Sequence, residues 1–247
     1  IATASQKGGV GKTTTAVNLS ASLAILDKSV LLVDIDPQGS VGDSFGLTRH
    51  NLTYGMFDVV TKGVPTIDAI IETKLKGFDV ICSNVWGEQN EAMFSQALTD
   101  NERLRSVLRP LKSHYDYIII DCPPSLGTIT VNAIVAADSV VIPVQCEYYA
   151  VKALGRFLKM TREVSASHNP SLSYRGFVLT MVDETDPLHN QMVAQLKQSL
   201  KGMIFYSIVP KNRQIAEAPS KHVPVALLDI TGLGATAYLD LAKEIIK

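Results

Sequence analysis

The sequence has few cysteines and no excess of charge of either sign. Its three cysteines, Cys82, Cys122 and Cys146, follow no metal-binding spacing. We expect them to be reduced, buried thiols in a cytosolic protein. The 23 lysines and arginines nearly balance the 24 aspartates and glutamates. No overall positive field therefore indicates nucleic acid, and any affinity for DNA must come from a local patch.

The sequence also lacks a signal peptide, a long apolar run, an internal repeat and a low-complexity tract. We therefore expect a soluble protein with no membrane partner. Ile1 is not a start methionine, so we expect a few upstream residues to be missing. The 247 residues, of which 46% are apolar, suit a single α/β domain spanning residues 1–247.

A glycine-rich stretch near the start of the chain carries the strongest signal. Residues 5–15 read Ser-Gln-Lys-Gly-Gly-Val-Gly-Lys-Thr-Thr-Thr, between a short apolar strand at 1–4 and a helical pattern. Such glycines let consecutive backbone N–H groups surround an anion, and the helix dipole adds to that field. Lys12 would contact the β- and γ-phosphates of a nucleotide, and the Thr13 hydroxyl would hold Mg²⁺. The alternative is a glycine-rich turn with solvated lysines, which leaves the order of strand, glycines and helix unexplained.

A second lysine stands at the start of this loop. In the ordinary P-loop a glycine lies five residues before the glycine of Gly-Lys-Thr, but here that position is Gln6, and Lys7 follows it. The ammonium group of Lys7 cannot easily fold back onto phosphates bound by its own loop. It could reach a nucleotide held by a second subunit.

Continuous apolar runs alternate with amphipathic helical patterns along the chain. This alternation predicts an α/β fold with a doubly wound, mostly parallel sheet flanked by helices. We expect strands over 29–34, 78–82, 117–121, 139–144, 175–182 and 203–209. We expect helices over 101–114, 128–137, 151–167, 187–200 and 232–247. Residues 41–66 predict a loop with a short helix, and residues 88–100 predict irregular structure.

Acidic residues end two of the predicted strands. Asp34 and Asp36 follow one apolar run, and Asp121 ends another. The carboxyl ends of parallel strands are where α/β sheets bind ligands. A carboxylate in that place can hold water bound to Mg²⁺. Asp34 and Asp36 could instead cap the turn that follows them.

Four segments in chain order resemble the ParA/MinD group of ATPases and, more narrowly, its ParA/Soj partition branch. The first, Lys-Gly-Gly-Val-Gly-Lys-Thr-Thr at 7–14, resembles a deviant Walker A motif. The others are Val-Asp-Ile-Asp-Pro-Gln-Gly at 33–39, Ile-Ile-Ile-Asp-Cys-Pro-Pro-Ser at 118–125 and Glu-Ala-Pro-Ser at 217–220. The resemblance covers nearly the whole chain.

The resemblance implies a P-loop NTPase fold and a Mg²⁺-dependent hydrolysis of ATP to ADP and phosphate. Lys7, Lys12 and Asp36 would be catalytic, with Asp36 near the Mg²⁺ to position or activate the attacking water. The metal ligands would be Thr13, Asp36 and Asp121. The nucleotide-binding residues would be Lys7, Gly8, Gly9, Val10, Gly11, Lys12, Thr13, Thr14, Met181, Pro210 and Asn212. Family proteins hold the adenine near the last three, and the Asn212 amide offers a base edge both a donor and an acceptor.

The resemblance also implies partners. ATP would lie between two subunits of a homodimer, with Lys7 of each reaching the phosphates of the other. The dimer would bind DNA non-specifically, and a ParB-like centromere-binding protein would stimulate slow hydrolysis and release it. We expect a cytoplasmic, nucleoid-associated protein. Glu147 matches a family segment near the dimer face, although a solvated glutamate explains it equally well.

The DNA contacts are where the sequence departs from the family. Two arginines that many ParA/Soj proteins use for non-specific DNA binding are replaced here by Thr185 and Gln214. Basic residues nearby and a stripe along the predicted helix 151–167 are the candidates, although most such stripes are merely solvated. The candidate DNA-binding residues are Arg156, Lys159, Arg162, Lys211, Arg213 and Lys221. The first strand begins the chain without a helix-turn-helix extension, so we expect no sequence-specific operator binding.

Other functions remain open in the sequence. A partition-type ATPase that positions a cargo other than a plasmid or chromosome fits equally. A MinD-like membrane-associated ATPase would need a C-terminal amphipathic helix rich in basic residues, whereas acidic residues balance the bases of 236–247. An electron-transfer ATPase like the nitrogenase iron protein would need cysteines in exposed, glycine-rich turns.

Overall fold

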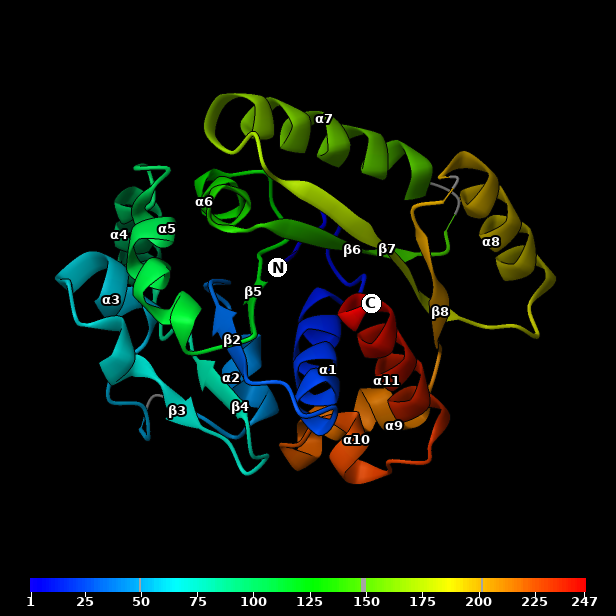
Figure 1. Cartoon of the computed structure of the whole chain (residues 1–247), viewed down its shortest axis with the longest axis horizontal. Helices are drawn as coiled ribbons and strands as arrows, with labels where there is room; N and C mark the ends of the chain where they lie inside the picture. The colour runs from blue at the N-terminus through cyan, green and yellow to red at the C-terminus, as the bar shows by residue number, and fades with distance from the viewer. Residues whose placement is uncertain (49, 148–149, 201) are drawn as a thin grey trace.

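One sheet of parallel strands organises the chain (Figure 1). The computed structural model describes residues 1–48, 50–147, 150–200 and 202–247. The strands in these residues are β1 (Ala2–Thr3), β2 (Val30–Asp34), β3 (Ile71–Glu72), β4 (Phe78–Ile81), β5 (Tyr117–Asp121), β6 (Ser139–Gln145), β7 (Ser173–Val182) and β8 (Ile204–Pro210). They lie in the order β3-β4-β2-β5-β1-β6-β7-β8, and all neighbours are parallel except the edge pair β3 and β4. The predicted doubly wound, mostly parallel sheet is confirmed.

Helices cover both faces of this sheet (Figure 1). The α-helices are α1 (Lys12–Ile25), α2 (Ser40–Ser44), α3 (Met56–Lys62), α4 (Glu88–Ala97), α5 (Arg103–Leu108), α6 (Thr128–Ala136), α7 (Ala150–His168), α8 (Pro187–Ser199), α9 (Arg213–Glu217), α10 (Val225–Leu228) and α11 (Leu233–Ile246). Short 3₁₀ turns are η1 (Thr66–Ala69), η2 (Arg109–Ser113) and η3 (Ala218–Lys221). Helices α3 to α8 pack on one face, and α1, α10 and α11 pack on the other.

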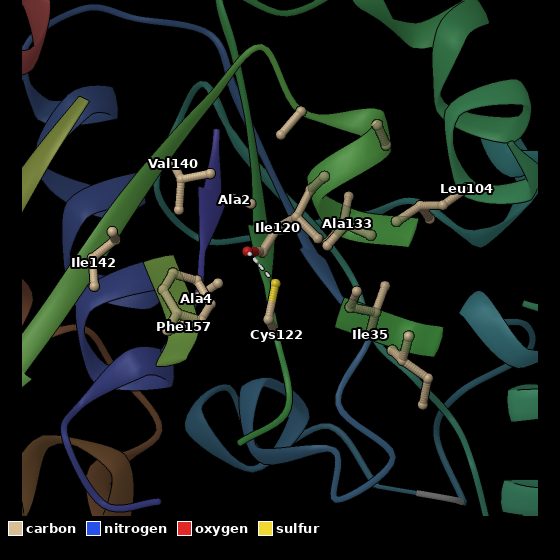
Figure 2. Close-up of a cluster of buried hydrophobic side chains, with 14 of the residues drawn as sticks. Ala2, Ala4, Ile35, Leu104, Ile120, Cys122, Ala133, Val140, Ile142 and Phe157 are labelled. Atoms are coloured by element: carbon tan, nitrogen blue, oxygen red, sulfur yellow. Dashed lines mark hydrogen bonds between the residues drawn. The ribbon is translucent and has the colours of Figure 1, made fainter. Parts of the chain in front are cut away.

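Two hydrophobic clusters separate along the strands because successive side chains point to opposite faces. In β2, Leu31 and Val33 join the cluster under α3 to α8, whereas Val30 and Leu32 join the cluster under α1 and α11. Figure 2 shows the first cluster around β1 and β5, with Phe157 of α7 and Ala4 among its members. Burial on both faces explains the continuous apolar runs of the sequence. It also fixes the ends of the central strands, where the charged residues lie.

The segment 88–100, expected to be irregular, contains a helix. Helix α4 covers Glu88–Ala97, and Phe94 within it and Leu98 at its end are completely buried. Glu88 and Glu91 lie in its first turn, where acidic side chains stabilise the positive end of the helix dipole. The segment is polar because only one side of the helix meets the core. The apolar pattern was therefore too sparse to reveal it.

Two other segments differ from expectation in detail. The predicted helix 101–114 is divided: α5 ends at Leu108, and η2 continues with Pro110 in its first turn. Proline cannot supply the N–H that a continuous α-helix needs. The segment 41–66 holds parts of two short helices, α2 and α3, rather than one. In α7, Leu154, Phe157 and Thr161 are buried, and Leu158 is partly buried.

The burial of α4 predicts that replacing two neighbouring residues, Phe94 and Met93, changes the free energy of unfolding by very different amounts. Phe94→Ala should lower the free energy of unfolding by about 3 kcal/mol or more, because it leaves a cavity in the core. Met93→Ala, at a side chain that is 43% exposed, is the control and should cost less than about 1 kcal/mol. Urea denaturation of both variants measures the two values. Equal destabilisation would mean that α4 does not pack as described.

Candidate functional site

A cavity of about 630 Å³ opens at the carboxyl ends of the central strands, where β1 leads into α1. It lies between the glycine-rich loop and the segments that follow β2, β7 and β8. Its lining includes Gly9, Gly11, Lys12, Thr13, Thr14, Asp36, Lys211, Met181, Pro210 and Asn212. The fold thus brings together residues that are more than two hundred positions apart in the sequence. Most of the predicted nucleotide-binding residues share this one cavity.

The loop that forms one wall needs its glycines. Gly9 and Gly11 have φ angles of 75° and 87°, a region that residues with a Cβ rarely adopt. Within the described part of the chain, none of the backbone N–H groups from Gly8 to Thr14 donates to another protein group. Unpaired N–H groups at the start of a 14-residue helix form an anion site. Val10, by contrast, is buried, and its carbonyl oxygen accepts from the Thr180 hydroxyl at 2.8 Å, which anchors the loop to β7.

Lys12 is buried beneath this loop. Its ammonium group donates to the carbonyl oxygen of Lys7 at 3.2 Å, and only 6% of the residue is exposed. Burial lowers the pKa of Lys12, and the carboxylates of Asp121 and Asp36 offset part of that effect. The two carboxylates compensate only part of the cost of burying the Lys12 cation. A bound phosphate would supply further negative charge, so the position of Lys12 suits a phosphate ligand.

Asp121 ends β5, is completely buried and does not line the cavity. Neither of its carboxylate oxygens has a hydrogen-bond partner among the described residues. Burial raises the pKa of Asp121 to about 7, while the nearby Thr13 hydroxyl lowers it in part and Asp36 raises it further. A buried, unpartnered carboxylate beside a threonine hydroxyl fits a Mg²⁺ site, because Mg²⁺ takes oxygen ligands.

This part of the protein supplies few metal ligands. Among the described residues, no group of three or more His, Cys, Asp or Glu side chains converges as a metal cluster would. That sparseness is compatible with Mg²⁺, which retains several waters and binds phosphates together with one or two protein groups. Thr13 and Asp36 line the cavity, and the buried Asp121 is close enough to both to have its pKa affected by them.

Asp36 projects from the loop between β2 and α2. It is 8% exposed, and its Oδ1 accepts the N–H of Gln38 at 3.0 Å. Asp34, completely buried, accepts the N–H groups of Asp36 and Val41. Burial raises the pKa of Asp34 well above its ordinary value, and Asp121 raises it further. The turn-capping role that the sequence left open for Asp34 is therefore present in the structure.

Lys7 points away from the cavity. Its ammonium group forms an ion pair with Glu147 and lies 3.5 Å from the Gln145 side-chain oxygen, both at the end of β6. The Lys7 and Glu147 side chains are 40% and 45% exposed. Lys7 therefore does not line the cavity of its own subunit.

The opposite end of the cavity is formed by the segments after β7 and β8. Met181 has a φ angle of 54°, which is unusual for a residue with a side chain. A register shift between β7 and β8 falls at this point. Asn212 is the N-cap of α9, and its side-chain Oδ1 accepts the N–H of Ile215 at 3.2 Å. That bond leaves the amide nitrogen of Asn212 without a protein partner among the described residues.

The sequence did not single out several other residues of the wall. Gln38 and Ser40 reach the cavity beside Asp36, and Tyr238 reaches it from α11. The position of Gln38 and Ser40 after Asp36 was a usable signal. Tyr238 had no such signal, because only the packing of α11 against α1 brings it here.

The candidate DNA-binding residues fall into two groups on opposite sides of the sheet. Arg156, Lys159 and Arg162 are exposed on α7, whereas the other three lie around α9 (Figure 1). Lys211 lines the cavity, and Arg213 pairs with Glu217 at 2.6 Å. One copy of the chain therefore does not present all six as a single patch.

The cysteines concern the alternative of an electron-transfer ATPase, and the helices concern that of a membrane-associated ATPase. Cys82, Cys122 and Cys146 are free and buried, so none lies in an exposed turn. No helix in the described ranges combines the length and apolar character of a membrane span.

Comparison with known proteins narrows the family. The sequence profile of a family described as "AAA domain" matches residues 1–174. The chain is 43% identical to the sporulation initiation inhibitor protein Soj of Bacillus subtilis (strain 168), across 99% of this chain and 97% of that protein. It is 40% identical to the chromosome partitioning protein ParA of Caulobacter vibrioides (strain NA1000 / CB15N), across 100% of this chain and 93% of the relative.

A solved structure extends the likeness to three dimensions. The cobyrinic acid a,c-diamide synthase of Mycobacterium smegmatis, with bound ADP and magnesium, superposes with a TM-score of 0.83. It is 29% identical in sequence, and the match covers 98% of this chain and 91% of that one. The two relatives, each matched over nearly its whole length, agree with the resemblance found in the four sequence segments. The chain belongs to the ParA/Soj family of partition ATPases.

Proposed function

We propose that this chain hydrolyses Mg²⁺-bound ATP to switch between a single copy and a DNA-binding homodimer. ATP would hold two copies together, and the pair would bind DNA without sequence preference. A ParB-like partner would stimulate hydrolysis and release the DNA. The same cycle would serve a partition ATPase that positions another cargo.

The observation that carries this proposal is the loop from Gly8 to Thr14. Its N–H groups have no protein acceptors in the described part of the chain, and the buried Lys12 lies beneath them. A triphosphate satisfies both, because it offers several acceptor oxygens and negative charge. Phosphoryl transfer depends chiefly on positioning and on charge stabilisation, and this wall of the cavity supplies both.

The divalent ion would be held by the Thr13 hydroxyl and the carboxylates of Asp36 and Asp121. When bound, Mg²⁺ neutralises charge on the phosphates. The carboxylate of Asp121, which is buried without a hydrogen-bond partner, would then have the Mg²⁺ ion and its waters as partners. Asp36, which borders the cavity, would orient the attacking water. A relative that is 29% identical was solved with ADP and magnesium, which supports the same ligands here.

The outward direction of the Lys7 side chain supports the proposed dimer. Its ammonium group lies at the surface beside Glu147, outside the cavity of its own subunit. An exposed ion pair of this kind contributes only about 0.2–1 kcal/mol. The phosphates of a second subunit can therefore displace Glu147 as the partner of Lys7. The dimer would form only when the nucleotide supplies that charge.

A membrane-bound cycle of the MinD kind has less support. The apolar side of α11 is buried against α1, with Tyr238, Leu241 and Ile245 almost inaccessible. Helix α11 cannot present that side to a lipid surface without leaving the core. We therefore favour DNA over a membrane as the surface that the dimer binds.

The lysine between subunits gives the first test of this proposal. Lys7→Ala should retain ATP binding and lose ATP-dependent dimerisation and hydrolysis, because the charge between subunits is removed. Light scattering with a non-hydrolysable ATP analogue, together with a phosphate-release assay, measures this. Lys76→Ala, at an exposed lysine away from the cavity, is the control. Wild-type activity in the Lys7 variant would refute the role between subunits.

Asp121 gives a second prediction, in which stability and activity change in opposite directions. Asp121→Asn should abolish Mg²⁺-dependent hydrolysis yet stabilise the nucleotide-free protein. Because burial raises the pKa of Asp121 to about 7 from 3.8, ionisation opposes folding as the pH rises through that window. The gain in melting temperature should be roughly 5 °C at pH 8, from about 2 kcal/mol, and should shrink toward pH 5.

Thermal denaturation without nucleotide or Mg²⁺ measures this gain. Asp68→Asn, at an exposed aspartate, is the matched control and should leave the melting temperature unchanged at every pH. A melting temperature that falls in Asp121→Asn at pH 8 would contradict the description of Asp121 as an unpaired buried charge.

DNA binding gives a third test. Affinity should require ATP and fall steeply with salt, because phosphate contacts release counterions. Arg213→Ala/Lys221→Ala should lower the salt slope by about 2 per subunit, if both residues contact phosphates. Arg156→Ala/Arg162→Ala removes the same charge from α7 and is the matched comparison. Loss confined to the α7 variant would move the DNA surface to α7, and binding without ATP would contradict the switch.

A further inference from the structure

We infer that Asp34 is the positioning residue for Asp36, because its single carboxylate holds both ends of the loop that carries Asp36. The inference rests on the proposed function, in which Asp36 orients the attacking water. Asp34 itself does not line the cavity, so it acts through the loop and not on the nucleotide.

The contacts of Asp34 span the loop. One carboxylate oxygen accepts the N–H of Asp36 at 3.0 Å, and the other accepts the N–H of Val41 at 3.2 Å. Val41 lies in the first turn of α2, whose N-cap is Gly39 and therefore offers no capping side chain. Asp34 supplies that cap from the end of β2. The same side chain thus fixes where the loop leaves the sheet and where α2 begins.

The rest of the loop is closed upon itself. The side chain of Asp36 accepts the N–H of Gln38, and its carbonyl oxygen accepts the N–H of Gly39 at 3.0 Å. These bonds shape the turn but do not attach it to the sheet. At its start the loop is attached to β5 through the N–H of Ile35, which donates to the carbonyl oxygen of Asp121 at 3.1 Å. The attachment at Asp36 and at Val41 comes from the carboxylate of Asp34, which is completely buried at the end of a central strand.

The chemistry of the two donors explains why an aspartate stands here. The two N–H groups point at different oxygens of the Asp34 carboxylate, and an asparagine would place an NH₂ donor at one of these two positions. The site is otherwise unfavourable for a carboxylate, because Asp34 and Asp121 are register partners on adjacent strands. A second buried charge beside Asp121 destabilises the fold unless its hydrogen bonds offset the cost. Both bonds therefore point to the loop as the purpose of Asp34.

The consequence for catalysis is positional. Asp36, Gln38 and Ser40 line the cavity from this loop, so a loop released from Asp34 moves all three. A displacement of about 1 Å in a positioning group can lower a rate by roughly a hundredfold. Nucleotide affinity comes mainly from the opposite wall, at Gly8 to Thr14, and should not change. The expected signature is a loss in kcat at nearly constant KM.

The test uses Asp34→Asn, which keeps the shape of the side chain and replaces one acceptor with a donor. Its kcat for Mg²⁺-ATP should fall at least about tenfold, with the KM for ATP within about twofold of the wild type. Hydrogen exchange of the nucleotide-free full chain should accelerate at least about tenfold in peptides covering 35–41. Peptides from β5 should be unchanged.

Asp58→Asn is the matched control. Asp58 is also a buried carboxylate that caps a helix: it accepts the N–H of Gly55 at 3.2 Å and pairs with Lys62 at 2.7 Å. It lies at α3, outside the cavity lining. The variant should lose thermal stability while keeping kcat within about twofold and leaving the exchange of 35–41 unchanged. A general loss of stability is thereby separated from a loss of positioning.

The outcomes distinguish the two proposals. If the wild-type protein does not hydrolyse Mg²⁺-ATP, the proposed function fails, while the exchange measurement still tests the attachment of the loop. If the wild type is active and Asp34→Asn matches it, or raises KM alone, Asp34 does not position Asp36. A fall in kcat without faster exchange of 35–41 also overturns the inference, because Asp34 would then act directly.

Discussion

The carboxyl edge of the central strands carries charge and hydrogen-bonding capacity that the protein does not satisfy by itself. Asp121 has no partner, Lys12 is buried, and the N–H groups of the glycine-rich loop have no acceptors in the described residues. Unsatisfied polar groups of this kind cost several kcal/mol in a protein interior. The cost is tolerable because a magnesium-bound triphosphate would satisfy all of them at once. The rest of the fold serves to hold these groups in place.

The sheet provides the necessary rigidity. β1 is only two residues long, but it pairs with β5 on one side and β6 on the other, between helices on both faces. Asp34 and Asp121 are brought into register by the pairing of β2 with β5. Placing two carboxylates side by side in this way would be unfavourable on a mobile loop. On two buried strands the hydrophobic clusters hold them together against their repulsion.

The sequence was sufficient for most of this description, and the reasons for its failures are physical. Apolar runs and the Gly-Lys-Thr motif located the strands and the loop, because buried strands and phosphate loops restrict which residues fit. Helix α4 was missed because one buried phenylalanine and its neighbour Leu98 are too few to make a pattern. Tyr238 and the pairing of Lys7 with Glu147 were out of reach, since both depend on packing between distant segments.

The position of Lys7 connects these local features to assembly. Lys12 is enclosed and has one subunit's cavity to act on, whereas Lys7 is held at the surface by a weak pair with Glu147. The two lysines of this segment therefore differ in which phosphates they can contact. In the proposed cycle, Lys12 would contact phosphate within the subunit, and Lys7 would contact only phosphate that a second copy holds. Nucleotide binding and dimerisation would then be coupled through one glycine-rich segment, because the same triphosphate would contact one lysine from each copy.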